Sequence, residues 1–270
     1  MTGWQLLTTT WEWYPSVIIG CLLVLLAHLA ATRLRLEAAT AWFAAGVVTV
    51  FLALVSPLDL LSDDYLFSAH MMQHILLAMV APLFFVLGLP ADLIRKALRW
   101  RPVAVAERLL GHPMAAWFLG NGTLCLWHAP ALYNATLENE QIHIFEHMTF
   151  LVTGTILWWP AFNRVPELQM KPLMSVLYLT LAGLVNGVLG IFFSLSTEPY
   201  YAPYLKPEDE HNLLPLLRGQ WGLDPLNDQQ LGGGLMWVLG TIIYLWAILL
   251  MVVRWYRLPD TDSETQRSVA

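Results

Sequence analysis

The chain has 270 residues, of which 57% are hydrophobic and only 13% are charged, and its mean hydropathy is +0.55. Soluble domains carry about 25% charged residues, so this composition excludes an ordinary soluble protein and indicates a membrane protein. The net charge of −6 decides little, and the basic residues show no pattern typical of nucleic-acid binding.

Seven stretches reach about the 18 apolar residues that a helix needs to cross a bilayer. In chain order they are residues 15–32, 38–56, 67–89, 114–131, 142–160, 172–195 and 231–253. The sequence therefore predicts an all-α integral membrane protein, with a single domain of seven transmembrane helices over residues 1–258. The polar tail, 259–270, is expected to be disordered. No Lys or Arg precedes the first stretch, so we expect no cleavable signal peptide.

The lysine and arginine residues predict the orientation of these helices. If the N-terminus lies outside, twelve of the 14 basic residues fall on the inner side, and only Lys206 and Arg218 fall on the outer side. Basic residues accumulate in cytoplasmic loops of membrane proteins. We therefore expect the N-terminus outside, the C-terminus in the cytoplasm, and the long loop 196–230 outside.

Five of the eight histidines are predicted to share one layer of the membrane, near its outer face. His70 and His74 lie in the first two turns of the third stretch, and His143 and His147 begin the fifth, which runs in the same direction. His128 lies about 22 Å along the fourth, which runs the opposite way. Ionisable residues inside a membrane are costly and usually functional.

The spacing of these histidines indicates a metal site. The motifs HMMQH and HIFEH each place two imidazoles on one face of a helix. Imidazole is the commonest metal-ligating side chain and suits Zn, Cu, Fe and Ni. We therefore predict that these five histidines bind metal.

Secondary candidates stand beside the motifs. Gln73 and Glu146 follow the first histidine of each motif by three residues and can orient ring N–H groups, and Glu146 can also ligate directly. Met71 and Met72 supply thioether sulfur, which favours Cu(I). Cys125 precedes His128 by three residues and is a weaker candidate, because a buried cysteine is more often a packing residue.

The remaining histidines and cysteines have simpler explanations. His28 and His112 lie near the predicted inner face, and His112-Pro113 resembles the start of a helix, so both are expected to be structural. His211 falls in the outer loop and is expected to be solvated. The two cysteines lie within predicted spans, so we expect no disulfide framework.

Four blocks are similar to the CtaG family of cytochrome c oxidase assembly proteins, which is associated with caa-type oxidases. The blocks are SAHMMQHILLAMVAPLFFVLGLP at 68–90, WHAPALYNATL at 127–137, HIFEHMTFLVTGTILWWP at 143–160 and GLDPLNDQQLGGGLMW at 222–237. The family's histidine motifs map onto the five histidines above. Its Asp-Gln-Gln motif maps onto Asp228, Gln229 and Gln230, which adds Asp228 to the secondary candidates and makes it part of an expected lid or access path.

The resemblance implies a multi-pass protein of the bacterial inner membrane that is needed to build an active terminal oxidase. It further implies delivery of copper, expected as Cu(I), to the buried binuclear copper centre of the oxidase. The expected partners are cytochrome c oxidase subunits, above all the copper- and haem-bearing one, and membrane lipid, with no nucleic acid. An assembly factor or metallochaperone is expected rather than an enzyme.

Two other functions fit the same residues. One is a membrane haem protein, with one histidine from the third span and one from the fifth as axial ligands. The other is a metal-dependent membrane enzyme that uses Glu146 as a general base. Five histidines also exceed what one tetrahedral site needs, which indicates either two sites or a relay between sites.

Overall fold

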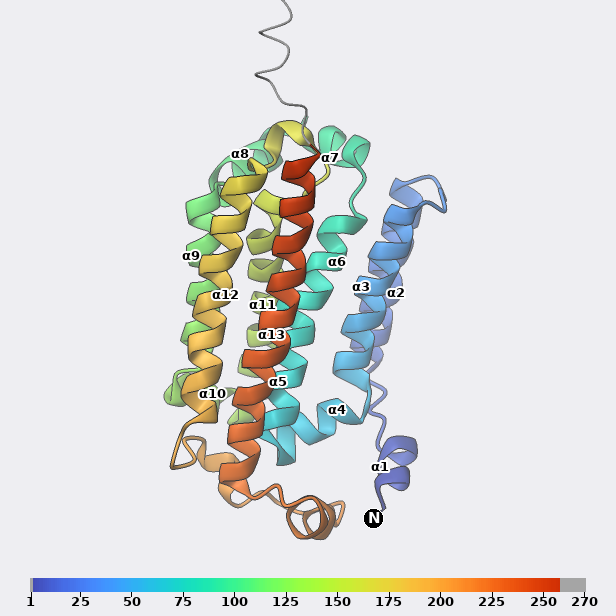
Figure 1. Ribbon diagram of the computed structural model, residues 1–270. Coiled ribbons are helices and arrows are strands. Elements are labelled where there is room, and N and C mark those ends of the chain that lie inside the picture. Colours follow the sequence, from blue (N-terminus) through green and yellow to red (C-terminus); the bar gives the residue numbers. More distant parts are fainter. Residues whose placement is uncertain (1, 258–270) are drawn as a thin grey trace, which may run out of the picture.

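The computed structural model describes residues 2–257, and every regular element of this part is a helix (Figure 1). The predicted all-helical class is therefore confirmed for these residues, while the predicted tail, 259–270, lies outside them. The long helices are α2 (Pro15–Ala31), α3 (Ala38–Val55), α9 (Pro113–Trp127), α11 (Glu140–Phe162), α12 (Pro172–Ser194) and α13 (Pro225–Tyr256). One more long helix runs without a break through α5 (Phe67–Ile75), η2 (Leu76–Val80) and α6 (Ala81–Gly88).

Short helices join the long ones at the two ends of the bundle. They are α1 (Gly3–Thr9), α4 (Pro57–Leu60), η1 (Leu61–Tyr65), α7 (Ala91–Ala97), α8 (Arg101–Leu110), α10 (Pro130–Glu138), η3 (Pro166–Leu168), η4 (Ala202–Leu205) and η5 (Pro215–Gln220). The N-terminus, α1, α4 and α10 lie at one end of the bundle, and α7 and α8 lie at the other (Figure 1). The two ends are called the α4 end and the α8 end below.

Four helices of the described part are long and apolar enough to cross a membrane. They are Ala38–Val55, Phe67–Gly88, Pro172–Ser194 and Pro225–Tyr256. The other three predicted ranges are also helical, but α2 has 17 residues and α9 has 15. The third of them, α11, has 23 residues and begins with polar ones. The chain is thus a helical protein with four candidate spans.

Two helix boundaries differ from the predicted ranges because of prolines. The fourth range was expected to reach residue 131, whereas α9 ends at Trp127 and α10 begins at Pro130. Proline lacks the N–H of a helix interior and disfavours helical geometry in the residue before it. The seventh range was expected to begin at residue 231, whereas α13 begins at Pro225, behind the capping side chain of Asp224. Proline in the first turn and an aspartate cap both favour helix initiation.

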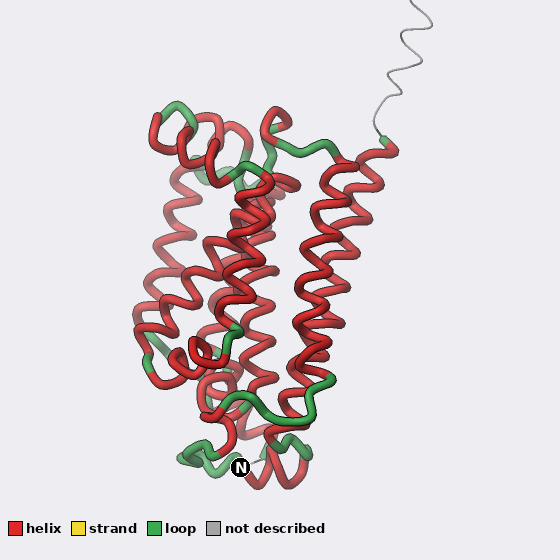
Figure 2. The backbone as a smooth tube through the Cα atoms, turned by 90° about the vertical axis from the view of Figure 1, so that its left-hand side faces the viewer, coloured by secondary structure: helices red, strands yellow, loops and turns green. Residues whose placement is uncertain are grey.

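The long helices form one bundle with a peripheral pair. α12 packs along α13, α9 packs on α11, and α5 packs on α13. α2 contacts α3, which in turn packs on α6, so this pair covers one side of the bundle (Figures 1 and 2). The α5–α6 helix is therefore central, with neighbours on several sides.

Gly154 permits the closest approach between α11 and the central helix. A Cβ atom added at Gly154 would lie 2.2 Å from the backbone oxygen of Ala78 in η2. Small residues at such crossings let helix backbones pack closely in membrane proteins. Gly154 lies two turns after His147 along α11, and Ala78 lies one turn after His74, so this crossing determines how near the two histidine motifs lie.

Gly154→Ala should therefore destabilise the protein. Its new methyl group meets backbone rather than a side chain that can move, and overpacking of this kind costs about 1–3 kcal/mol. Gly122→Ala in α9 is the matched control, because a Cβ atom there has no neighbour within 4 Å. The measurement is thermal unfolding of both variants in detergent. Equal midpoints for the two variants would contradict the close crossing.

Candidate metal centre

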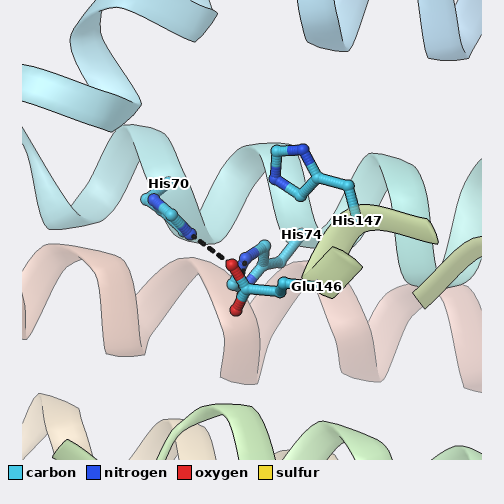
Figure 3. Close-up of side chains that lie close together, drawn as sticks. All are labelled: His70, His74, Glu146 and His147. Carbon is cyan, nitrogen blue, oxygen red and sulfur yellow. Dashed lines mark ion pairs between the residues drawn. The ribbon is translucent and has the colours of Figure 1, made fainter. Parts of the chain in front are cut away.

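Four side chains from α5 and α11 converge at the α4 end of the bundle. His70 and His74 come from α5, and Glu146 and His147 come from α11 (Figure 3). Each offers one nitrogen or oxygen atom, and these atoms lie within 4.8 Å of one another. We call these four residues the buried centre.

The carboxylate of Glu146 lies at the middle of the imidazoles. Its Oε1 atom is 3.5 Å from Nε2 of His74, and its Oε2 atom is 3.7 Å from Nε2 of His70 and 4.0 Å from Nε2 of His143. The side chain of Glu146 has no exposed surface, and His70 is equally enclosed. These distances exceed those of hydrogen bonds but leave room for an ion that contacts several of the groups.

Most polar atoms of the buried centre and of the neighbouring His143 ring form no hydrogen bond. Within residues 2–257, the buried side-chain atoms without a hydrogen bond include Nε2 of His70, His143 and His147, both ring nitrogens of His74, and both carboxylate oxygens of Glu146. Buried polar groups in proteins are nearly always paired, and an unpaired one costs about 1–3 kcal/mol. Such a concentration of unpaired nitrogen and oxygen atoms fits a cation ligand set.

Helical spacing places these residues on shared faces. His143, Glu146 and His147 stand at positions i, i+3 and i+4 of α11 and therefore project to one side. The start of α11 is defined by Asn139, whose side chain accepts hydrogen bonds from two backbone N–H groups of the first turn. His70 and His74 share a face of α5 in the same way, with ring centroids 4.2 Å apart.

A second group lies beside the buried centre. Asp63 of η1, His70 and His143 also bring ligand atoms within 4.8 Å of one another, and Oδ2 of Asp63 is 3.6 Å from Nδ1 of His143. Sequence reasoning missed Asp63, because residues 57–66 carry no helical periodicity that relates them to the histidines. The available signal was the acidic pair Asp63-Asp64 directly before the third span.

His128 lies next to the buried centre but outside both groups. Its ring centroid is 5.6 Å from that of His74. Its Nδ1 atom lies 2.7 Å from the carbonyl oxygen of Leu124, and its Nε2 atom lies 3.3 Å from Sδ of Met71. Met71 is fully buried, so the structure places one thioether against this imidazole.

Two other secondary candidates lie away from the unpaired atoms. Met72 is only partly buried, and Cys125 is exposed on α9. The structure therefore brings together four of the five predicted histidines, sets His128 beside them, and leaves the Cys125 thiol on the bundle surface.

Gln73 supports the centre from behind. Its side-chain nitrogen donates to the carbonyl oxygen of Ala53 and to Oδ1 of Asp59, and its oxygen accepts from Ser62. It therefore ties α5 to α3, α4 and η1 and orients no histidine ring directly. Burial and, to a lesser extent, repulsion from Asp63 raise the pKa of Asp59 to about 8.

The loop between α12 and α13 covers the centre with tyrosines. The hydroxyl of Tyr204 donates to the carbonyl oxygen of Ser62 at 2.6 Å and lies 3.3 Å from Nδ1 of His70. The hydroxyl of Tyr201 donates to the carbonyl oxygen of His128. These contacts position the loop against the ligand-bearing residues.

Asp228 holds the start of α5 in place. Its carboxylate accepts hydrogen bonds from the backbone N–H groups of Phe67 and Ser68, at 2.6 and 3.2 Å, and from the Ser68 hydroxyl. These are free N–H groups at the N-terminus of the helix that carries His70, so Asp228 caps α5 from a different helix. The Gln229 side chain forms hydrogen bonds with Ser196, Glu198 and Tyr200 and so holds the α12–α13 loop against α13.

Three histidines lie away from the centre. His28 is buried and stacks on Phe43, with ring centroids 3.9 Å apart. His112 is exposed and directly precedes α9, which begins at Pro113 as expected. His211 is exposed in the α12–α13 loop.

Fold and site together define the class: a helical membrane protein that encloses a cluster of imidazoles and carboxylates near one end of its bundle. The family model described as cytochrome c oxidase caa3 assembly factor (Caa3_CtaG) matches residues 21–258. The chain belongs to this family, which confirms the resemblance seen in its sequence blocks.

Curated relatives are more distant. Uncharacterized proteins of Mycobacterium bovis, Mycobacterium tuberculosis and Mycobacterium leprae are each 24% identical over 208 residues. Each match covers 71% of this chain and 30% of the relative, so the chain spans about a third of the length of these proteins. No solved structure matches the chain.

Asp228→Ala should weaken both the fold and the centre. Loss of a helix N-cap costs about 0.5–2 kcal/mol, and displacement of a supporting residue typically lowers metal affinity about 10- to 100-fold. Asp92→Ala is the control, because its carboxylate is 73% exposed and faces Arg35 at 3.7 Å. Exposed ion pairs contribute at most about 1 kcal/mol. Thermal unfolding and copper titration of both variants check this, and equal behaviour would contradict the capping role.

Proposed function

We propose that this protein binds copper, as Cu(I), at the buried centre and assists its insertion into cytochrome c oxidase. The single observation that carries the proposal is the set of unpaired nitrogen and oxygen atoms of His70, His74, Glu146 and His147. Membership of an assembly-factor family supplies the biological context and favours a role other than catalysis.

The physical argument concerns the cost of burial. A carboxylate and several imidazoles enclosed without partners are unfavourable, and a bound cation would compensate them together. Neutral imidazole is the ligating form, so a dry site that opposes protonation also favours metal. The donor set contains imidazoles, which suit copper, and the adjacent thioether of Met71 favours Cu(I) over harder ions.

The proposal includes a membrane topology. We infer seven spans, with the α4 end of the bundle outside and the α8 end in the cytoplasm of a bacterial cell, in the inner membrane. The basic residues support this orientation, because Arg95, Lys96, Arg99, Arg101 and Arg108 all lie in the α7–α8 segment. The buried centre would then lie near the outer face, where a copper carrier can load from the outer compartment.

The proposed partner is cytochrome c oxidase, through its copper- and haem-bearing subunit. A binuclear copper centre within a membrane subunit can be reached sideways by a metal site held at similar depth. The family description supports the oxidase as the partner. Under the proposed topology, the buried centre would meet this partner within the membrane.

Removal of one ligand should strongly weaken copper binding. We expect His74→Ala or His147→Ala to lower copper affinity by more than about 100-fold, because even supporting residues contribute about 10- to 100-fold. Both should also lower cytochrome c oxidase activity in the host, with partial rescue by added external copper. Metal analysis of anaerobically purified protein and oxidase assays measure this.

His112→Ala is the control for these variants, because His112 is exposed at the far end of α9. Full copper content and full oxidase activity in the His74 and His147 variants would overturn the proposal. A Soret band in the purified protein would instead favour the haem alternative, and activity that depends on Glu146 together with a bound metal would favour an enzyme.

The topology has its own test. A reporter fused after Pro259 should behave as cytoplasmic, and one inserted near Glu208 in the α12–α13 loop should behave as external, because α13 ends at the α8 end of the bundle, where the basic α7–α8 segment lies (Figure 1). Enzymatic reporters that are active on one side of the membrane make the measurement. The opposite pattern would place the buried centre near the cytoplasm.

A further inference from the structure

We propose that Asp63, His70 and His143 form an uptake site, from which one metal ion passes to the buried centre by ligand exchange. The inference deepens the proposed function and rests on it. Its basis is the second group of converging ligand atoms, which shares His70 with the buried centre and adds a carboxylate from a different element, η1.

Side-chain exposure decreases from Asp63 through His143 to Glu146. The side chain of Asp63 is 35% exposed, that of His143 is 11% exposed, and that of Glu146 is fully enclosed. An ion that arrives from the α4 end therefore meets Asp63 first. Its path from solvent to the buried carboxylate runs past one imidazole ring.

The ring of His143 faces both carboxylates. Its Nδ1 atom lies 3.6 Å from Oδ2 of Asp63, and its Nε2 atom lies 4.0 Å from Oε2 of Glu146. Nδ1 thus faces the uptake site, and Nε2 faces the buried centre. No other histidine of the described part forms close charge contacts with two different acidic residues in this way.

His70 determines how many ions the two groups can hold. Its Nδ1 atom lies 3.3 Å from the carbonyl oxygen of Ser62 and 3.3 Å from the hydroxyl of Tyr204, so hydrogen-bond contacts already engage this nitrogen. Its Nε2 atom, by contrast, is among the buried atoms of residues 2–257 that form no hydrogen bond. Because the two groups share His70, filling one competes with filling the other, and the pair operates on a single ion.

The transfer is a substitution of ligands without any change of oxidation state. The ion keeps its bond to His70 while its bonds to Asp63 and His143 break and bonds to His74, Glu146 and His147 form. The negative charge of Glu146 replaces that of Asp63 in the coordination shell. No electron or proton need be supplied, and the ion moves from a partly hydrated site to an enclosed one.

Asp63→Asn separates uptake from storage. The substitution removes the charge but keeps a side-chain oxygen. In the unaltered protein, Oδ1 of Asp63 accepts a hydrogen bond of 2.8 Å from the Ser62 hydroxyl, and the asparagine oxygen can accept the same bond. Asp64→Asn is the matched control, because the neighbouring carboxylate is exposed and belongs to neither group. Full-length protein in detergent is mixed anaerobically with Cu(I) held by a coloured chelator, and the rate and final extent of copper transfer are recorded.

We expect Asp63→Asn to take up Cu(I) about tenfold more slowly than the unaltered protein, since acidic access sites accelerate cation binding about 10- to 1000-fold. Its final copper content should be unchanged, at a single ion, and Asp64→Asn should load at nearly the normal rate. Unaltered uptake in Asp63→Asn, or equal slowing in both variants, would overturn the uptake site.

Loss of copper from Asp63→Asn at equilibrium would also overturn the two-step path, by making Asp63 a ligand of one common centre. Failure of the proposed function itself would be seen in the copper content of the unaltered protein and of His74→Ala. It would appear as no copper in the unaltered protein, or as full copper in His74→Ala, whatever the uptake rate of the Asp63 variant.

Discussion

The constraint on which the structure depends is the burial of a carboxylate among imidazoles. Glu146 has no exposed side-chain surface, and three histidine nitrogens stand within 4.0 Å of its oxygens without forming hydrogen bonds to them. Such an arrangement is stable only where positive charge compensates the carboxylate. Enclosure disfavours the protonated form of the imidazoles, and the neutral imidazole is the form that binds a metal, so stability and ligand binding are coupled at this point.

The surrounding bundle holds the two ligand-bearing helices in register around that carboxylate. Asp228 secures the first turn of α5 from α13, and Gly154 lets α11 approach the same central helix. Gln73 joins α5 to the α3–η1 side. The Asp-Gln-Gln motif thus contributes through position, since it fixes a helix start and a covering loop.

The sequence was sufficient for the helices and for most of the centre because both follow from periodicity. Apolar length predicts helices, and His70 and His74 must share a face when they stand four residues apart. Asp63 could not be predicted, because the turn of η1 that aims it at His143 has no repeat in the sequence. Asp228 was expected at a lid or metal site, whereas its capping contacts depend on where α13 crosses the start of α5. The exposed position of Cys125 likewise depends on how α9 is rotated against α11.

The π-helical turn η2 interrupts the central helix between its ligand-bearing half and its packing half. A π turn holds one residue more than an α turn, so it changes the angular phase of everything that follows by about 100°. The faces of α5 and α6 are therefore set separately, one toward Glu146 and the other toward α3. Insertion or deletion of one residue elsewhere in this helix, where no π turn absorbs it, would rotate one half against the other by about 100°. The extra residue of this turn, as much as the composition of the helix, keeps the histidines turned inward.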